Sequence, residues 1–134
     1  MRFRIFCAES NQTDMEIYKE FQFEAAHYLP NLPEDHKCRR MHGHSYRIKL
    51  YIGGPIDPAI GWIKDFADIK KSFTPVYKQL DHYVLNDIEG LENPTSENLA
   101  RWIWNKTKPL LPELTRVEVM ETCTTGCIYE GDDS

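Results

Sequence analysis

The sequence contains no apolar run that approaches the roughly 18 residues needed for a membrane-spanning helix. It also has no excess of basic residues, because 16 Lys and Arg stand against 21 Asp and Glu, which gives a formal net charge of −5. This balance argues against general nucleic-acid binding and leaves room for an anionic small molecule in a local pocket. No hydrophobic stretch of signal-peptide length follows the N-terminal arginines. We therefore expect a cytoplasmic protein with no membrane partner and no direct nucleic-acid partner.

Cysteine is scarce too, with four residues in a chain of 134. In the cytoplasm these side chains are expected to be thiols. Cys123 and Cys127 are separated by three residues, a spacing that matches no strong zinc-binding pattern. We interpret both as small packing residues of a turn.

The length fits one domain, and a hydrophobic fraction of 41% suffices for a packed core. Residues 1–15 lack periodicity and are expected to form a leader, residues 16–130 the domain and residues 131–134 a tail. Alternating polarity predicts strands, and apolar residues three and four positions apart predict helices. The predicted elements are strands at 17–29 and 42–52, helices at 66–80 and 96–106, and strands at 116–122 and 127–129.

This order of elements predicts an α+β domain with an antiparallel four-stranded sheet and two helices on one face. Asp65 is suited to cap the first helix, and Thr95 or Ser96 the second. Pro75 interrupts the first helical pattern, where we expect a kink or a restart.

Three of the five histidines form the strongest chemical signal. His42 and His44 are one residue apart, so on a strand their side chains leave the same face. His27 closes an alternating strand whose apolar side it shares. Three imidazoles and no further protein ligand are typical of a catalytic zinc site, because the fourth position stays open for water or substrate. The alternative is three ordinary packed histidines.

Cys38 lies between Lys37 and Arg39, and neighbouring cations favour a thiolate that can act as nucleophile or general base. Alternatively, Cys38 is a loop thiol or a fourth metal ligand, which would make the zinc structural. Asp81 precedes His82 and can orient its ring for a proton relay, although an exposed pair at a helix end explains the dipeptide equally well.

Glu121 follows Val117 and Val119 on the apolar face of a predicted strand, where a carboxylate needs a partner. A heterocycle with a ring N–H and an exocyclic amine, such as a pterin or guanine edge, can form two parallel bonds to it. A buried arginine or a helix end is an equal alternative.

Six segments in one order resemble the 6-pyruvoyl-tetrahydropterin synthase family over about residues 17–129. Three residues separate Cys38 from His42, which is similar to the compact loop of the carboxy-tetrahydropterin branch; the animal pyruvoyl synthases carry a longer insertion there. The segments are FEAAH at 23–27, CRRMHGH at 38–44, GWIKDF at 61–66, LDH at 80–82, NPTSE at 93–97 and ETC at 121–123.

The resemblance implies a tunnelling fold, in which subunits join their sheets into a trimeric barrel and two trimers stack into a homohexamer. It also implies active sites between subunits and a bound Zn²⁺. The residues that it places at the site are the metal ligands His27, His42 and His44, the catalytic residues Cys38, Asp81 and His82, and the substrate-binding residues Glu121, Thr95 and Ser96.

The implied activity is that of a zinc-dependent lyase acting on a pterin triphosphate. It converts 7,8-dihydroneopterin triphosphate into 6-carboxy-5,6,7,8-tetrahydropterin, releases acetaldehyde and triphosphate, and belongs to queuosine biosynthesis. One alternative is 6-pyruvoyl-tetrahydropterin synthesis, which eliminates triphosphate without cutting the side chain. A second is a non-catalytic pterin- or purine-binding module with structural zinc. Lys37, Arg39 and Arg40 are candidates for the triphosphate contacts.

Overall fold

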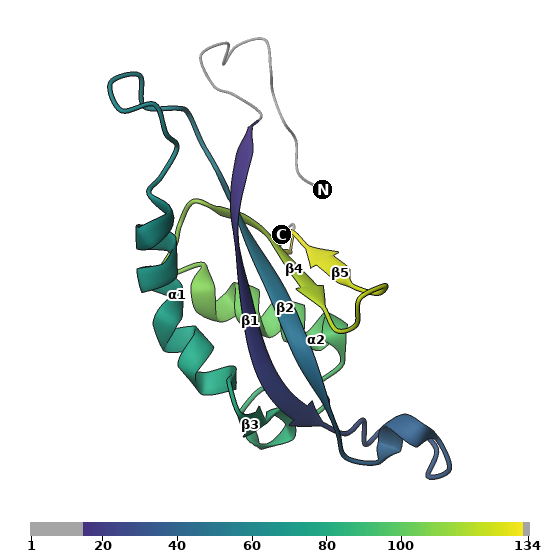
Figure 1. Ribbon diagram of the computed structural model, residues 1–134. Helices are drawn as coiled ribbons and strands as arrows, with labels where there is room; N and C mark the ends of the chain where they lie inside the picture. Colours follow the sequence, from purple (N-terminus) through teal and green to yellow (C-terminus); the bar gives the residue numbers. More distant parts are fainter. Residues whose placement is uncertain (1–14, 133–134) are drawn as a thin grey trace.

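The computed structural model describes residues 15–132 (Figure 1). The predicted leader, apart from Met15, lies outside the described residues, as do Cys7 and the last two residues of the tail. The elements in chain order are β1 (Glu16–His27), η1 (Lys37–Arg39), β2 (His42–Gly53), α1 (Phe66–Leu80), β3 (Tyr83–Val84), η2 (Leu85–Asp87), α2 (Ser96–Thr107), β4 (Leu114–Met120) and β5 (Cys127–Tyr129).

Within residues 15–132, the sheet has five strands in the order β3-β1-β2-β4-β5. The predicted four-stranded antiparallel sheet is therefore wrong in two respects, because β3 is an additional strand and pairs with β1 in parallel. The remaining pairs are antiparallel. A strand of two residues is too short to show a period in the sequence, which explains why β3 was not predicted.

β1 and β2 form a long antiparallel ribbon, and the register of this pair brings the histidines close together. Each strand has 12 residues, and His27 lies opposite His42 at one end. Further along, the rings of Phe23 and Tyr46 stack with their centroids 5.1 Å apart. Because residues two apart share a face of a strand, this pairing puts the histidines on the same side as the core.

α1 begins where the Asp65 side chain accepts a hydrogen bond of 2.9 Å from the backbone N–H of Ala67. The helix continues unbroken through Pro75, so the predicted restart does not occur. Buried side chains lie on both sides of the proline and hold the helix against the sheet at the cost of one backbone hydrogen bond. These buried residues are Ile69, Phe73, Val76 and Leu80.

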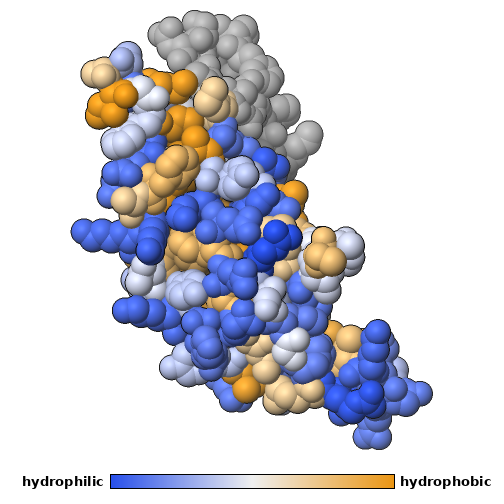
Figure 2. All heavy atoms as spheres, in the orientation of Figure 1, coloured by the Kyte–Doolittle hydropathy of each residue, from blue (hydrophilic) through white to orange (hydrophobic). Residues whose placement is uncertain are grey.

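Both helices cover one face of the sheet, here called the inner face (Figure 1). The opposite, outer face carries charged and aromatic side chains, and Figure 2 shows hydrophilic side chains over much of it. There the Arg47 guanidinium lies 3.7 Å from the Glu20 carboxylate, and the Lys49 ammonium lies 4.7 Å from the centre of the Tyr18 ring. Across residues 15–132, the helices fall short of the length and apolarity required to cross a membrane.

Candidate metal and substrate site

The structure brings His27, His42 and His44 together on the inner face, at the end of the β1–β2 ribbon. One ring nitrogen of each lies within 4.8 Å of one ring nitrogen of the other two. His27 is buried, with 1% of its surface exposed. The three imidazoles therefore form a group that can hold a metal ion.

Backbone carbonyls orient two of the rings. The Nδ1 atom of His27 lies 2.8 Å from the carbonyl oxygen of Pro94, and that of His42 lies 2.7 Å from the carbonyl oxygen of Arg40. Because a carbonyl only accepts, each Nδ1 carries the hydrogen and each Nε2 keeps its lone pair. This tautomer is inferred from the hydrogen-bond partners.

The Nε2 atoms of His27 and His42 are 3.0 Å apart. Two lone pairs at that distance repel unless a proton or a metal ion lies between the rings. The Nε2 atom of His44 is also buried and has no hydrogen-bond partner among the described residues. The three ring nitrogens thus have lone pairs that accept no hydrogen bond from the part of the protein that the structure describes. This arrangement fits a zinc ion, which binds neutral imidazole ligands.

Burial also lowers the pKa of His27 from its ordinary value of 6.5, and the positive charges that His42 and His44 can carry act in the same direction. The Pro94 carbonyl and the Glu121 carboxylate oppose this shift, but burial is the larger effect. Burial thus favours the neutral form of His27, which is the form that binds a metal.

Cys38 lies in the η1 turn and is a free, half-buried thiol; Cys123 and Cys127 are free as well. The metal-binding group formed within residues 15–132 does not include its sulfur. The backbone of Cys38 is held at both ends: its N–H donates to Nδ1 of His36 over 3.0 Å, and its carbonyl oxygen accepts from the N–H of Leu29 over 2.9 Å. These contacts leave the thiol available for chemistry.

Glu121 lies one residue beyond β4 and turns toward the metal-binding group. Its Oε1 accepts a hydrogen bond of 2.9 Å from the Ser96 hydroxyl, and its Oε2 lies 3.5 Å from Nε2 of His44. The His44 contact is close enough for an ion pair and not aligned as a hydrogen bond. Ser96 is the first residue of α2, so a helix end supplies one partner. Among the residues that the structure describes, no buried arginine contacts Glu121.

The residues around the start of α2 contact both His27 and Glu121. Pro94 orients His27 through its carbonyl, and Ser96 binds Glu121. Thr95 has a different role, because its hydroxyl accepts the N–H of Asn98 over 3.1 Å and caps the helix. The Pro94 carbonyl carries no sequence signal, since every residue has one, so sequence reasoning missed it.

Asp81 and His82 lie at the edge of β1, away from β2. The Asp81 carboxylate accepts the N–H of Glu24 over 3.0 Å and lies 2.9 Å from Nδ1 of His82. The Glu24 N–H, followed by the contact with His82, holds the pKa of Asp81 below its ordinary value of 3.8. His82 adopts a positive φ of 69°, a conformation rare for residues other than glycine, and its backbone N–H donates to the Glu24 carbonyl oxygen.

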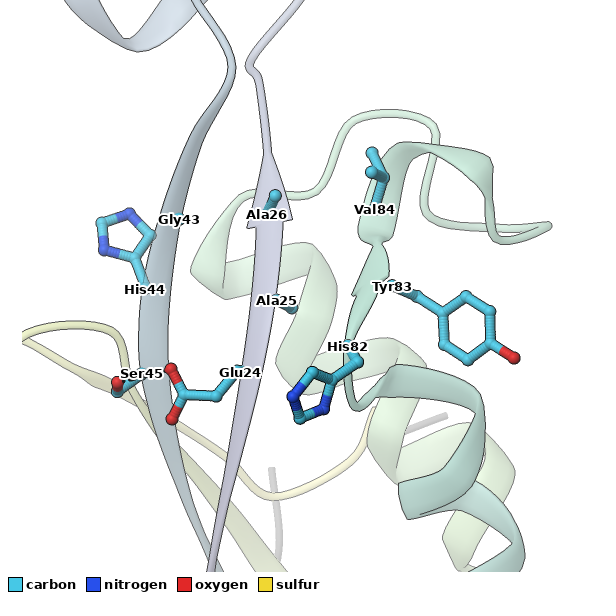
Figure 3. Close-up of a pocket in the computed structure, with 9 residues that line it drawn as sticks. All are labelled: Glu24, Ala25, Ala26, Gly43, His44, Ser45, His82, Tyr83 and Val84. Carbon is cyan, nitrogen blue, oxygen red and sulfur yellow. Dashed lines mark hydrogen bonds between the residues drawn. The ribbon is translucent and has the colours of Figure 1, made fainter.

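A cavity of about 450 Å³ opens beside His82. Glu24 and Ser45 share its wall, and the Ser45 hydroxyl donates to the Glu24 carboxylate over 2.7 Å (Figure 3). Because Glu24 and Ser45 alternate with core residues, they belong to the outer face. Among residues 15–132, no hydrogen bond or ion pair joins Asp81 or His82 to Cys38 or to the three imidazoles. His44 also lines this cavity, but the described contacts of one chain do not connect Asp81 and His82 directly with the rest of the predicted relay.

The 6-pyruvoyl tetrahydropterin synthase family model matches residues 16–132. The chain belongs to this family. A 6-carboxy-5,6,7,8-tetrahydropterin synthase from Synechocystis sp. is 47% identical over 119 residues, which cover 84% of this chain and 91% of that protein. The human 6-pyruvoyl tetrahydrobiopterin synthase is 32% identical, across 87% of this chain and 92% of its own.

The fold is that of the family as well. The structure of the Caenorhabditis elegans 6-pyruvoyl tetrahydropterin synthase matches with a TM-score of 0.81 at 30% identity, covering 88% of this chain and 96% of that one. As a member of the 6-pyruvoyl tetrahydropterin synthase family, the chain shares the α+β architecture with a five-stranded mixed sheet and two helices.

Proposed function

We propose that this protein is a 6-carboxy-5,6,7,8-tetrahydropterin synthase. It converts 7,8-dihydroneopterin triphosphate into 6-carboxy-5,6,7,8-tetrahydropterin, with release of acetaldehyde and triphosphate, in cytoplasmic queuosine biosynthesis. The observation that carries the proposal is the 47% identity to the Synechocystis enzyme of that name over most of both chains. The synthase domain comprises residues 16–130, preceded by a leader at 1–15.

Zn²⁺ is the proposed cofactor, held by His27, His42 and His44. The facing Nε2 atoms and the orphaned nitrogen of His44 support this assignment. When bound, the ion supplies Lewis-acid polarisation of the hydroxyl groups on the substrate side chain.

The chain's own residues bind the substrate and move protons. The Glu121 carboxylate accepts hydrogen bonds from the ring N–H and the exocyclic amine of the pterin. Ser96 holds this carboxylate in place, and Thr95 caps the helix that carries Ser96. Fixing the pterin edge sets the register of the side chain against the metal-binding group. The Glu121–Ser96 hydrogen bond and the proximity of Glu121 to His44 support this placement.

Cys38 removes a proton from the substrate side chain, and His82, oriented by Asp81, supplies or returns one. Because no described contact links Asp81 or His82 to Cys38 within one chain, we assign Cys38 to one copy and His82 to another. We therefore extend the proposal to a homohexamer of two stacked trimers, in which sheets join into a barrel. The short edge strands β3 and β5 leave open edges that such joining would cover.

Product mass after incubation with 7,8-dihydroneopterin triphosphate tests the reaction. Release of acetaldehyde together with 6-carboxy-5,6,7,8-tetrahydropterin is expected. A 6-pyruvoyl product without acetaldehyde would instead assign the sibling activity, which the 32% identity to the human synthase keeps as the second candidate. The zinc content of the protein must be measured before the assay, because protein without zinc is expected to give neither product.

A non-catalytic module with structural zinc makes a different prediction for Cys38. If the thiol were a fourth ligand, Cys38→Ala would lower metal content. The catalytic proposal expects full metal content and lost turnover in that variant, and a bound pterin without any product in the wild type would support the module.

A further inference from the structure

The η1 turn that carries Cys38 is not held by apolar packing. None of its three residues is buried, and the loop between β1 and β2 projects from one end of the molecule (Figure 1). An exposed turn of this length has a marginal stability of its own. The position of the Cys38 thiol must therefore depend mainly on hydrogen bonds.

His36 is the N-cap of this turn. Its side chain accepts the Cys38 N–H over 3.0 Å, with extended backbone angles of φ −73° and ψ 134°. Acceptance from the second residue of the turn is the geometry that Ser, Asn or Asp provides at other helix starts. A histidine in this place acts through a neutral Nδ1 with its hydrogen on Nε2.

The backbone of His36 is anchored as firmly as its side chain. Its N–H donates to the carbonyl oxygen of Pro33 over 2.9 Å, and its own carbonyl accepts from the N–H of Arg39 over 3.0 Å. In the described part of the chain, the side chain makes no ion pair and no ring contact. The hydrogen bond from the Cys38 N–H is thus the one polar contact of the imidazole among the described residues.

We propose that His36 is a positioning residue that acts through Cys38. Its Nδ1 fixes the Cys38 amide from one side while Leu29 fixes the carbonyl from the other, so the thiol keeps a defined place relative to the substrate. The catalytic consequence rests on the proposed function of Cys38, whereas the hydrogen bond itself does not.

Three variants test the proposal: His36→Ala removes the acceptor, His36→Asn replaces it, and Asp35→Ala is the matched control in the same exposed loop. In His36→Ala, hydrogen exchange of the Cys38 amide and alkylation of the thiol are expected to accelerate roughly threefold to tenfold, the typical effect of deleting a cap. His36→Asn should restore both rates, and Asp35→Ala should leave them unchanged. Peptide-level mass spectrometry separates Cys38 from the other thiols.

Turnover should follow the same order, with kcat lowered in His36→Ala, KM unchanged and activity recovered in His36→Asn. Unchanged exchange in His36→Ala, or failure of His36→Asn to restore it, would overturn the proposal. Lost turnover with unaltered Cys38 exchange would also overturn it, because His36 would then act on the substrate. If the protein made no pterin product at all, the exchange and alkylation rates would still test the hydrogen bond.

Discussion

His27 and His42 point their Nε2 atoms at each other across the β1–β2 ribbon, 3.0 Å apart, while each Nδ1 is bonded to a backbone carbonyl oxygen. The register of the two strands places these residues directly opposite. The carbonyls fix the tautomers, and the tautomers leave two lone pairs that need a cation between them. The alternation of side chains along the two strands thus produces a group of imidazoles that can hold a metal ion.

Replacing His27 should empty that site. We expect His27→Ala to lower zinc content to a small fraction of one ion per chain, because two imidazoles seldom retain the ion. Metal analysis of purified, folded protein measures this. His82→Ala is the matched control, since it removes an exposed histidine at the β1 edge and should keep its zinc. Full occupancy in His27→Ala would remove His27 from the site.

Glu121→Gln should weaken pterin binding without unfolding the protein. The amide oxygen still accepts from Ser96, but the charge that favours the pterin N–H groups is gone, at a cost of about 1.5–3 kcal/mol, or roughly tenfold or more in Kd. Fluorescence titration with a pterin measures the affinity. Glu118→Gln, three residues earlier in β4 and bonded to the Tyr51 hydroxyl, serves as the control. Equal affinity in both variants would count against an anchoring role.

Mixing inactive variants tests whether the site is shared between copies. Cys38→Ala and His82→Ala should each lack turnover. Random mixed oligomers should recover about one quarter of the wild-type rate, because that share of sites receives both intact residues from neighbouring copies. Activity that stays absent after mixing would mean that both residues must come from one chain. The lack of a direct contact between Cys38 and His82 among the described residues of one chain motivates this expectation.

The long strands and the helices, whose side chains repeat with a regular period, were predictable from the sequence. Alternation over β1 and β2 fixed the strands within two residues at each end, and with them the shared face of His27, His42 and His44. The stripe of α1 and the caps at Asp65 and Thr95 followed from the same local rules.

Other features depend on contacts between distant segments and leave no pattern in the sequence. β3 forms only because the chain after α1 meets the edge of β1. The Pro94 carbonyl orients His27 from 67 positions away. Likewise, the adjacency of Asp81 and His82 predicted their pairing. Their position relative to the sheet, however, depends on two hydrogen bonds with the backbone of Glu24, which is distant in the sequence.

Asp81 provides a pH-dependent test of that arrangement. Its pKa is held below 3.8 in the folded chain, chiefly by the Glu24 N–H, so the unfolded chain takes up the proton at a higher pH than the folded chain. The carboxylate therefore stabilises the fold fully above 3.8, and this contribution is lost as the pH falls through the lowered pKa. Asp81→Asn cannot titrate and should lack the contribution at every pH.

Urea unfolding at fixed protein concentration measures the difference between wild type and Asp81→Asn. The gap in the free energy of unfolding should be constant from neutral to mildly acidic pH and should shrink below 3.8. Asp35→Asn, in an exposed loop, should show no gap at any pH. A gap for Asp81→Asn that persists unchanged into strong acid would mean that the ionised carboxylate is not the source of the gap, since the Asn amide oxygen can still accept the Glu24 N–H.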